Sequence, residues 1–184
     1  PLSPMPTLSL TGRLLAGFAL LAAPSLAQPA APCTTEAAGG LDFWIGTWDL
    51  AWDTASGPDT GSGTNVIARG LAGCVVHERF TDTTPDSGYQ GESVSVLTPQ
   101  GWRQTWVDNA GAYLLFDGAT DAEGRVVEMR SAPFTNPAGQ TQVNRMIWED
   151  VTEDALTWRW QASTDGGATW ADSWVIRYTR GSAD

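Results

Sequence analysis

The sequence predicts an all-β protein, an antiparallel up-and-down barrel of about ten strands. Short segments rich in Val, Trp, Thr and Tyr recur through residues 41–180. Turn sequences such as Pro85-Asp-Ser-Gly88 and Asn136-Pro-Ala-Gly139 separate them at short intervals. A sandwich is the alternative, but Greek-key sandwiches need long return connections that these tight turns do not supply. A block of about 140 residues is the size of one domain.

The N-terminal segment predicts export. Arg13 precedes an apolar run over residues 14–23, and Ser25-Leu-Ala27 ends in small residues. This pattern is typical of a secretory signal peptide, and the run is shorter than a membrane-spanning helix. A buried helix and a lipoprotein anchor at Cys33 are the alternatives; Pro32 disfavours the anchor. We expect a signal peptide over 1–27, an arm over 28–40, a barrel over 41–181, and a periplasmic or secreted location.

The first strand is predicted from strict alternation. Trp48, Leu50 and Trp52 alternate with polar or small residues, which is typical of a strand with one buried face. Later segments with strand character cover residues 74–81, 92–98, 102–108, 112–117, 125–131, 142–150, 155–163 and 170–180.

The two cysteines, Cys33 and Cys74, suit an oxidising compartment. A disulfide between them closes a loop of about 40 residues and contributes roughly 3–4 kcal/mol in the chain-entropy model. Two free thiols are the alternative. We expect the disulfide, which would hold the N-terminal arm against the barrel wall.

The turn Ser163-Thr-Asp-Gly-Gly-Ala-Thr-Trp170 matches the Asp-box hairpin found in sialidase propellers. A short carboxylate there binds turn amides and glycine supplies a positive φ. Sialidases repeat the motif, whereas this chain has it once. We interpret it as a structural turn and not as a catalytic feature.

The opening Leu41-Asp-Phe-Trp-Ile-Gly-Thr-Trp-Asp49 resembles the F-D-F-W-x-G-x-W-D start of an often exported bacterial domain-of-unknown-function family. Further matches are Gly73-Cys74 with Glu78, Gly91-Glu-Ser93, Trp102-Arg-Gln-Thr-Trp106-Val-Asp108, Arg145-Met-Ile-Trp148, the Asp-box turn and Tyr178-Thr-Arg180. The resemblance implies a lipocalin-like barrel, related in shape to fatty-acid-binding proteins and to the haem-binding nitrobindins.

The charge balance limits the partners. Lys and Arg number 10 against 21 Asp and Glu, a net charge of −11. An acidic surface repels phosphate backbones and anionic lipid. We therefore expect no nucleic acid and no binding to a membrane surface. The short apolar run predicts no membrane span, and the partner that we expect is a small apolar or amphipathic molecule. The sequence does not indicate an oligomeric state.

Polar residues on apolar strand faces identify the candidate site. Glu78 shares a face with Val76 and Phe80, and Arg145 shares one with Val143 and Ile147. A buried charge needs a partner, so we expect Glu78 and Arg145 to pair inside the barrel. The candidate ligand-binding residues are Glu78, Gln104, Trp106, Asp108, Arg145, Trp148, Trp160 and Tyr178.

Three functions suit this set. The polar groups could orient the polar end of a ligand while tryptophans enclose its apolar body. They could instead only satisfy one another and set the strand register, as in a structural or protein-binding module. In an enzyme of the isomerase or cyclase type, Glu78 or Asp108 would be the general base and Arg145 would stabilise an oxyanion. We favour binding without catalysis.

No cofactor or metal is expected. The only histidine, His77, alternates out of phase with Val76 and Glu78 and should face solvent. Nitrobindin-like barrels hold haem through a later histidine, and none follows here. One histidine and two cysteines do not make a usual zinc site. Residues 117–124 carry oxygen ligands for calcium, but a hairpin turn explains them better.

Overall fold

Ten β-strands form the wall of a closed barrel in this computed structural model, which describes Cys33 and residues 36–181. The strands are β1 (Gly46–Thr54), β2 (Gly57–Gly70), β3 (Val75–Asp82), β4 (Gln90–Thr98), β5 (Gly101–Asp108), β6 (Tyr113–Thr120), β7 (Val126–Ser131), β9 (Thr141–Glu149), β10 (Ala155–Ser163) and β11 (Ala171–Arg180). A short strand, β8 (Phe134–Thr135), pairs only with β9. The described residues also form short 3-10 helices, which are η2 (Glu36–Gly39), η3 (Asp42–Trp44) and η4 (Leu71–Gly73).

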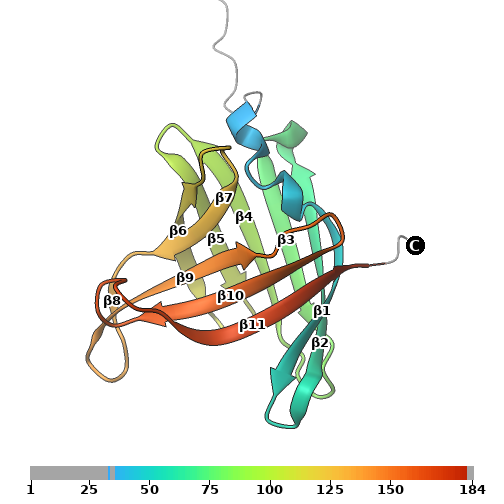
Figure 1. Cartoon of the computed structure of the whole chain (residues 1–184), viewed down its shortest axis with the longest axis vertical. Coiled ribbons are helices and arrows are strands. Elements are labelled where there is room, and N and C mark those ends of the chain that lie inside the picture. The colour runs from blue at the N-terminus through green and yellow to red at the C-terminus, as the bar shows by residue number, and fades with distance from the viewer. Residues whose placement is uncertain (1–32, 34–35, 182–184) are drawn as a thin grey trace, which may run out of the picture.

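Antiparallel pairing of chain neighbours closes the barrel. The ladder runs β10-β11-β1-β2-β3-β4-β5-β6-β7-β9, and β9 pairs with β10 to complete the circle (Figure 1). The first strand therefore lies beside the last, with Leu50 opposite Tyr178. This arrangement confirms the predicted up-and-down barrel and excludes the sandwich.

Alternation along β1 confirms that one strand face is buried. Trp48, Leu50 and Trp52 are buried, while Thr47 and Asp49 are exposed. The pattern arises because successive side chains point to opposite faces of a strand. The strand β2 escaped prediction, since its many glycine, serine and threonine residues read as a turn.

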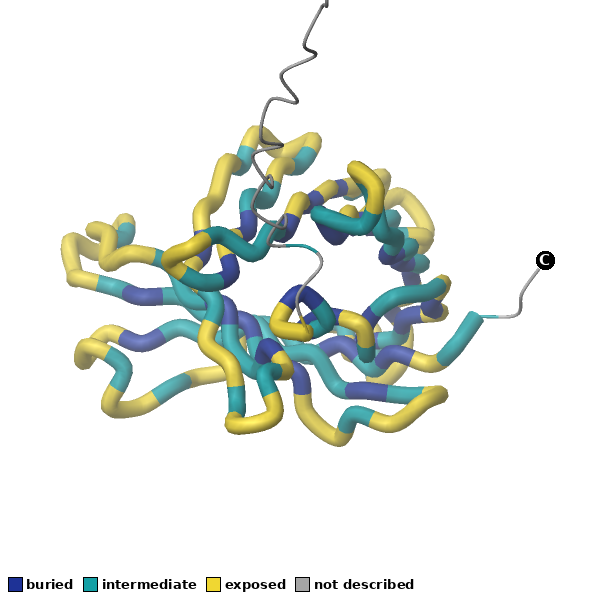
Figure 2. The backbone as a smooth tube through the Cα atoms, turned by 90° about the horizontal axis from the view of Figure 1, so that it is seen from above, coloured by how far each residue is buried: buried dark blue, intermediate teal, exposed yellow. Residues whose placement is uncertain are grey.

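One end of the barrel is closed by the segment that precedes β1. Leu41 and Trp44 are fully buried, and the Trp48 indole N–H donates to the Trp44 carbonyl at 2.8 Å. The backbone N–H of Val126 donates to the Gly40 carbonyl at 2.8 Å. In Figure 2 this segment lies across the ring of strands when the molecule is seen from above. The barrel interior is therefore closed at this end by packed side chains.

A disulfide joins Cys33 to Cys74, between η4 and β3, as predicted. It ties Cys33 to the segment between these two elements. The predicted signal peptide, residues 1–27, lies outside the described residues. Within the described ranges, no helix has the length and apolar character needed to cross a membrane.

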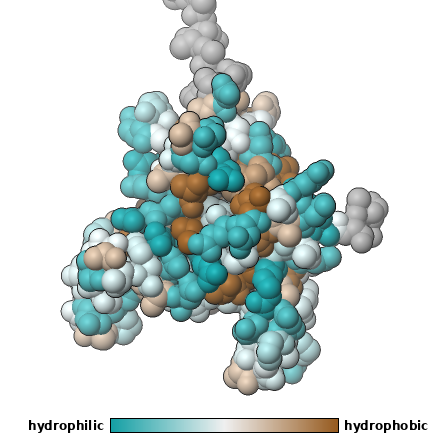
Figure 3. All heavy atoms as spheres, in the orientation of Figure 1, coloured by the Kyte–Doolittle hydropathy of each residue, from teal (hydrophilic) through white to brown (hydrophobic). Residues whose placement is uncertain are grey.

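The face of the molecule drawn in Figure 3 is mostly hydrophilic at its edges. In Figure 3, hydrophobic residues gather near the middle of the face shown, and hydrophilic residues surround them. Strongly exposed apolar side chains include Leu71, Tyr113 and Leu115. The larger apolar and aromatic side chains instead face the interior, where they form both the core and the site described next.

Candidate functional site

A cavity of about 170 Å³ lies inside the barrel wall. The lining residues come from six of the ten barrel strands, β3, β5, β6, β9, β10 and β11, and from the segment before β4. They are Glu78, Phe80, Tyr89, Trp106, Asp108, Leu114, Phe116, Met146, Trp158, Trp160, Trp174, Ile176 and Tyr178.

The lining runs from an exposed rim to a buried floor. Leu114 is exposed, and Trp106, Tyr89 and Asp108 are half-buried. Glu78 and Tyr178, by contrast, are 7% and 2% exposed. The cavity therefore has its carboxylates at two depths, with Asp108 at the rim and Glu78 at the floor.

Aromatic rings form most of the wall, and they meet in both parallel and perpendicular pairs. Trp158 and Trp160 lie parallel, with ring centroids 6.3 Å apart. Trp174 stands perpendicular to Trp158 at 6.0 Å, and Phe116 is almost perpendicular to Trp160 at 5.7 Å. Edge-to-face pairs stabilise one another through the ring quadrupole. The result is a rigid aromatic box with both faces and edges of rings around it.

The floor of the pocket is a hydrogen-bond network around Glu78. The Ser93 hydroxyl donates to Glu78 Oε2 at 2.6 Å, and the Asn65 amide donates to Glu78 Oε1 at 2.7 Å. The same amide nitrogen donates to the Tyr178 hydroxyl oxygen at 3.1 Å. Register produces these contacts, because Glu78 and Ser93 are directly opposed across β3 and β4. Among the described residues, no cationic side chain forms an ion pair with the Glu78 carboxylate.

Burial changes the protonation of this network. Burial raises the pKa of Glu78 to about 7, and the hydrogen bonds from Ser93 and Asn65 only partly oppose it. Burial, together with the nearby Glu78 charge, also raises the pKa of Tyr178 well above its usual value. A carboxyl that titrates near neutral pH at the floor of a pocket is able to exchange a proton there.

Asp108 at the rim is held by neutral donors. Its Oδ2 accepts hydrogen bonds from Tyr89 at 2.9 Å and from the Trp106 indole at 3.0 Å. Its Oδ1 accepts from the backbone N–H groups of Ala110 and Ala112. Burial acts to raise the pKa of Asp108, but these hydrogen bonds outweigh it and hold the pKa below its usual value. Asp108 is therefore a fixed negative charge.

Gly91 allows Trp106 to lie against the wall. Gly91 pairs with Phe80 on one side and Asp108 on the other. A Cβ atom at this position would lie 2.1 Å from Cζ2 of Trp106, so no larger residue fits without moving the indole. The lack of a side chain at Gly91 thus leaves room for the Trp106 indole, which donates to Asp108.

The structure places several predicted site residues in one cavity. Glu78, Trp106, Asp108, Trp160 and Tyr178 all line it. Gln104 faces the interior but donates to Ser95 at 3.0 Å, outside the lining. Trp148 packs at the closed end against Trp44, with ring centroids 5.3 Å apart. These two residues belong to the core around the pocket.

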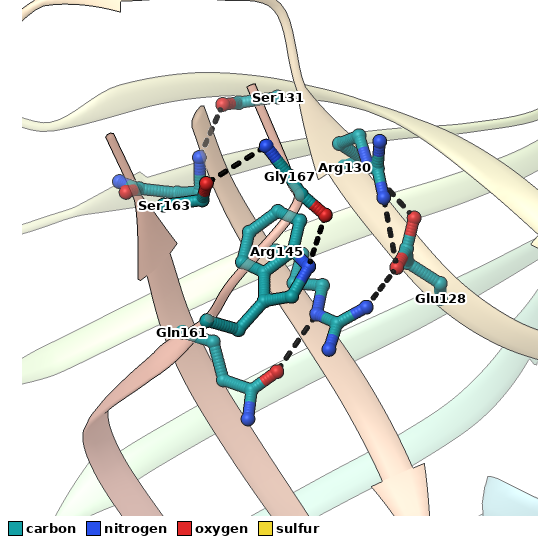
Figure 4. Close-up of polar contacts among 9 residues, drawn as sticks. Glu128, Arg130, Ser131, Arg145, Gln161, Ser163 and Gly167 are labelled. Carbon is teal, nitrogen blue, oxygen red and sulfur yellow. Dashed lines mark hydrogen bonds and ion pairs between the residues drawn. The ribbon is translucent and has the colours of Figure 1, made fainter. Parts of the chain in front are cut away.

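The predicted pairing of Glu78 with Arg145 is wrong. Arg145 donates to Glu128 at 2.8 Å and to Gln161 at 2.7 Å, and its guanidinium lies 4.1 Å from the ring centre of Trp170 (Figure 4). Both faces of β9 carry apolar residues, so alternation did not reveal which one faces inward. Met146 and Trp148 occupy the inner face. Arg145 lies outside because a guanidinium there avoids the cost of full desolvation.

Sequence reasoning missed several residues of the site. Asn65 lies on the unpredicted strand β2, and Ser93 is a small residue without a distinctive pattern. Tyr89 lies in a loop whose contact with Asp108 spans 19 residues. Trp174 lines the cavity but is not among the candidate residues. Only Trp174 carried a usable signal, because it shares a strand face with the candidate residue Tyr178.

The remaining sequence predictions concern turns and His77. His77 is exposed, as predicted from its phase. Asp121 binds the backbone and side chain of Arg125 in the hairpin between β6 and β7, which confirms a turn there. Asp165 of the Asp-box turn accepts hydrogen bonds from Thr169 and Ser163, and these hold its pKa well below the usual value. These contacts support a structural role for that turn.

Together the fold and the pocket define the class of protein: a closed ten-stranded antiparallel barrel with a Trp-rich interior. No protein-family model and no curated protein matches the chain. A solved structure that is similar to it is a de novo designed fluorescence-activating β-barrel, with 12% identity and a TM-score of 0.39. That match covers 80% of this chain and 99% of the designed one.

Proposed function

We propose that this protein binds one small, mostly apolar molecule inside the barrel without changing it. The observation that carries the proposal is the cavity itself, which joins a wall of aromatic side chains to a small number of convergent polar groups. Ligand pockets in proteins have this composition, because apolar contacts supply affinity and a few polar groups set orientation.

The size of the cavity limits the ligand. In other proteins an apolar cavity of about 150 Å³ holds benzene. The cavity of about 170 Å³ suits a ligand of one or two rings. Part of such a ligand would project past Leu114 toward the rim. The rigid wall favours a flat molecule over a long flexible chain, because ordering a flexible chain costs conformational entropy.

The proposal includes location and family. The Cys33–Cys74 disulfide supports an oxidising compartment, the periplasm or the exterior. The resemblance of Leu41–Asp49 to an exported family of lipocalin-like barrels belongs to the same proposal. Such a protein would carry or sequester its ligand outside the cytoplasm.

Naphthalene binding tests the proposal, measured by titration calorimetry on wild-type protein and two variants. Leu114→Trp adds bulk at a position that lines the cavity, whereas Leu115→Trp makes the same change at the exposed neighbouring position. We expect one site per chain in the wild type, about tenfold weaker binding in Leu114→Trp because of the lost space, and unchanged binding in Leu115→Trp. Absence of saturable binding to wild-type protein would refute a ligand-binding interior.

A second candidate function is catalysis by Glu78 as a general base. The observation that favours it is the pKa of about 7, on a buried carboxyl that lines the cavity. Asp108, with its lowered pKa, is the weaker base. Exchange of the α-protons of 1-indanone in deuterated buffer, followed by NMR, tests this role. Catalysed exchange that disappears in Glu78→Gln supports it, and exchange at the uncatalysed rate eliminates it for this substrate class.

A further inference from the structure

The ionisable groups of the pocket are all acids. Glu78 and Asp108 line it together with Tyr89 and Tyr178, and no arginine or histidine is among the lining residues of the described chain. Both tyrosines have raised pKa values and stay neutral at physiological pH; burial comes first among the causes. The fixed charge in the cavity is therefore negative.

Four arginines of the strands and ends around the pocket are engaged elsewhere. Arg145 and Arg130 bind Glu128 on the outer face, and Arg159 binds Glu149 and Asp172. Arg180 is at the closed end, where it donates to the carbonyls of Ile45 and Glu153 and lies over Trp48. Among the described residues, no positive side chain forms an ion pair with either carboxylate of the pocket.

The hydrogen bonds to these carboxylates leave their charge in place. Asn65 and Ser93 bind Glu78, while Trp106 and Tyr89 bind Asp108, and each of these donors is neutral. Glu128 differs from them, because it has two arginine partners, which Figure 4 shows. Neutral donors orient a carboxylate but do not cancel the field that it projects into a low-dielectric cavity.

We propose that the pocket selects a flat organic cation, a protonated amine or quaternary ammonium group carried on a single ring. Tryptophan faces attract cations through the ring quadrupole, and boxes of aromatic side chains recognise quaternary ammonium groups in this way. The carboxylates at rim and floor add attraction, whereas an anionic ligand would be repelled at both depths. This inference rests on the proposed function, and it adds the charge of the ligand.

Phenyltrimethylammonium and tert-butylbenzene test the inference, because they have nearly the same shape and differ in charge. Calorimetric titrations at about pH 8 keep Glu78 mostly ionised, since its pKa is about 7. We expect the cation to bind at least about tenfold more tightly than the hydrocarbon. Glu78→Gln and Asp108→Asn should each reduce this ratio about threefold or more, because each removes one negative charge.

Glu123→Gln is the matched control, since it removes the same charge from an exposed turn between β6 and β7. Its ratio should equal that of the wild type, because solvent screens a remote surface charge. Should Asp108→Asn unfold its turn, as circular dichroism would report, Glu78→Gln still decides the outcome.

The possible outcomes distinguish a failure of the cation preference from a failure of small-molecule binding. Equal or tighter binding of tert-butylbenzene overturns the cation preference and leaves small-molecule binding intact. Binding of neither compound, with naphthalene also unbound, overturns both. An equal loss of cation preference in Glu123→Gln and Glu78→Gln would assign the effect to overall charge and overturn selection by the pocket.

Discussion

Ser93 and Glu78 lie directly opposite each other on β4 and β3, and the serine hydroxyl donates to the carboxylate at 2.6 Å. The pair is buried, and the pKa of Glu78 is raised because burial outweighs this bond and the one from Asn65. An ionised Glu78 is therefore tolerated but costs stability.

The pH dependence of stability should reveal this cost. The folded pKa of about 7 exceeds the ordinary value of 4.5, so the folded state binds the proton more tightly. The contribution of Glu78 is fully present below about pH 4.5 and falls by roughly 3 kcal/mol as the pH rises through 7. Urea unfolding of the wild type and of Glu78→Gln across this pH range measures this loss. The unfolding free energy of the variant should exceed that of the wild type by an amount that grows as the pH rises. Parallel curves would contradict a raised pKa.

Removal of the serine hydroxyl should raise the pKa of Glu78 further, because the bond stabilises the charged form. We expect Ser93→Ala to lose about 1.5–3 kcal/mol at alkaline pH, where Glu78 is ionised, and less at acidic pH. Ser95→Ala is the control: this buried serine on the same strand face contacts Gln104 instead. NMR titration of the Glu78 carboxyl carbon measures the pKa, and an unchanged value in Ser93→Ala would exclude the expected coupling.

Gly91→Ala should disturb the rim of the pocket. The added Cβ would overlap Trp106, so the indole must move and its bond to Asp108 must break. We expect a loss of about 1–3 kcal/mol in unfolding free energy, typical of overpacking, and weaker naphthalene binding. Gly181→Ala, where the nearest atom is a Thr47 methyl 3.3 Å from the added Cβ, should cost much less stability and leave naphthalene binding unchanged. Full probe affinity in Gly91→Ala would show that the position of Trp106 is unimportant.

Arg145→Ala should reduce stability and leave the pocket unaffected. The guanidinium loses its contacts with Trp170 and Glu128, for a cost of about 1–2 kcal/mol. Arg103→Ala, which removes an exposed partner of Asp117, should cost about 0.5 kcal/mol or less. Thermal unfolding with a parallel naphthalene titration separates the two effects. Weakened probe binding in Arg145→Ala alone would contradict the placement of Arg145 outside the barrel.

Much of this fold follows from local pattern. Alternation on β1 and β3 identified their buried faces, because a strand places every second residue on the same side. Tight turns at short spacing predicted chain-neighbour pairing, and only a closed barrel satisfies both edges of such a sheet. The strand β2 was not predicted, because its glycines resemble a loop. The inward face of β9 was not identified, because both of its faces are partly apolar.

The sequence by itself therefore determined an all-β barrel, the inward faces of β1 and β3, and the presence of a buried carboxyl, Glu78. Only the tertiary structure decided which groups meet. Tyr178 reaches Asn65 across 113 residues, and Arg145 finds Glu128 and Trp170 instead of Glu78. The physical reason is that hydrogen bonds and ion pairs act over a few ångströms, and strand register across the whole sheet sets which side chains come that close.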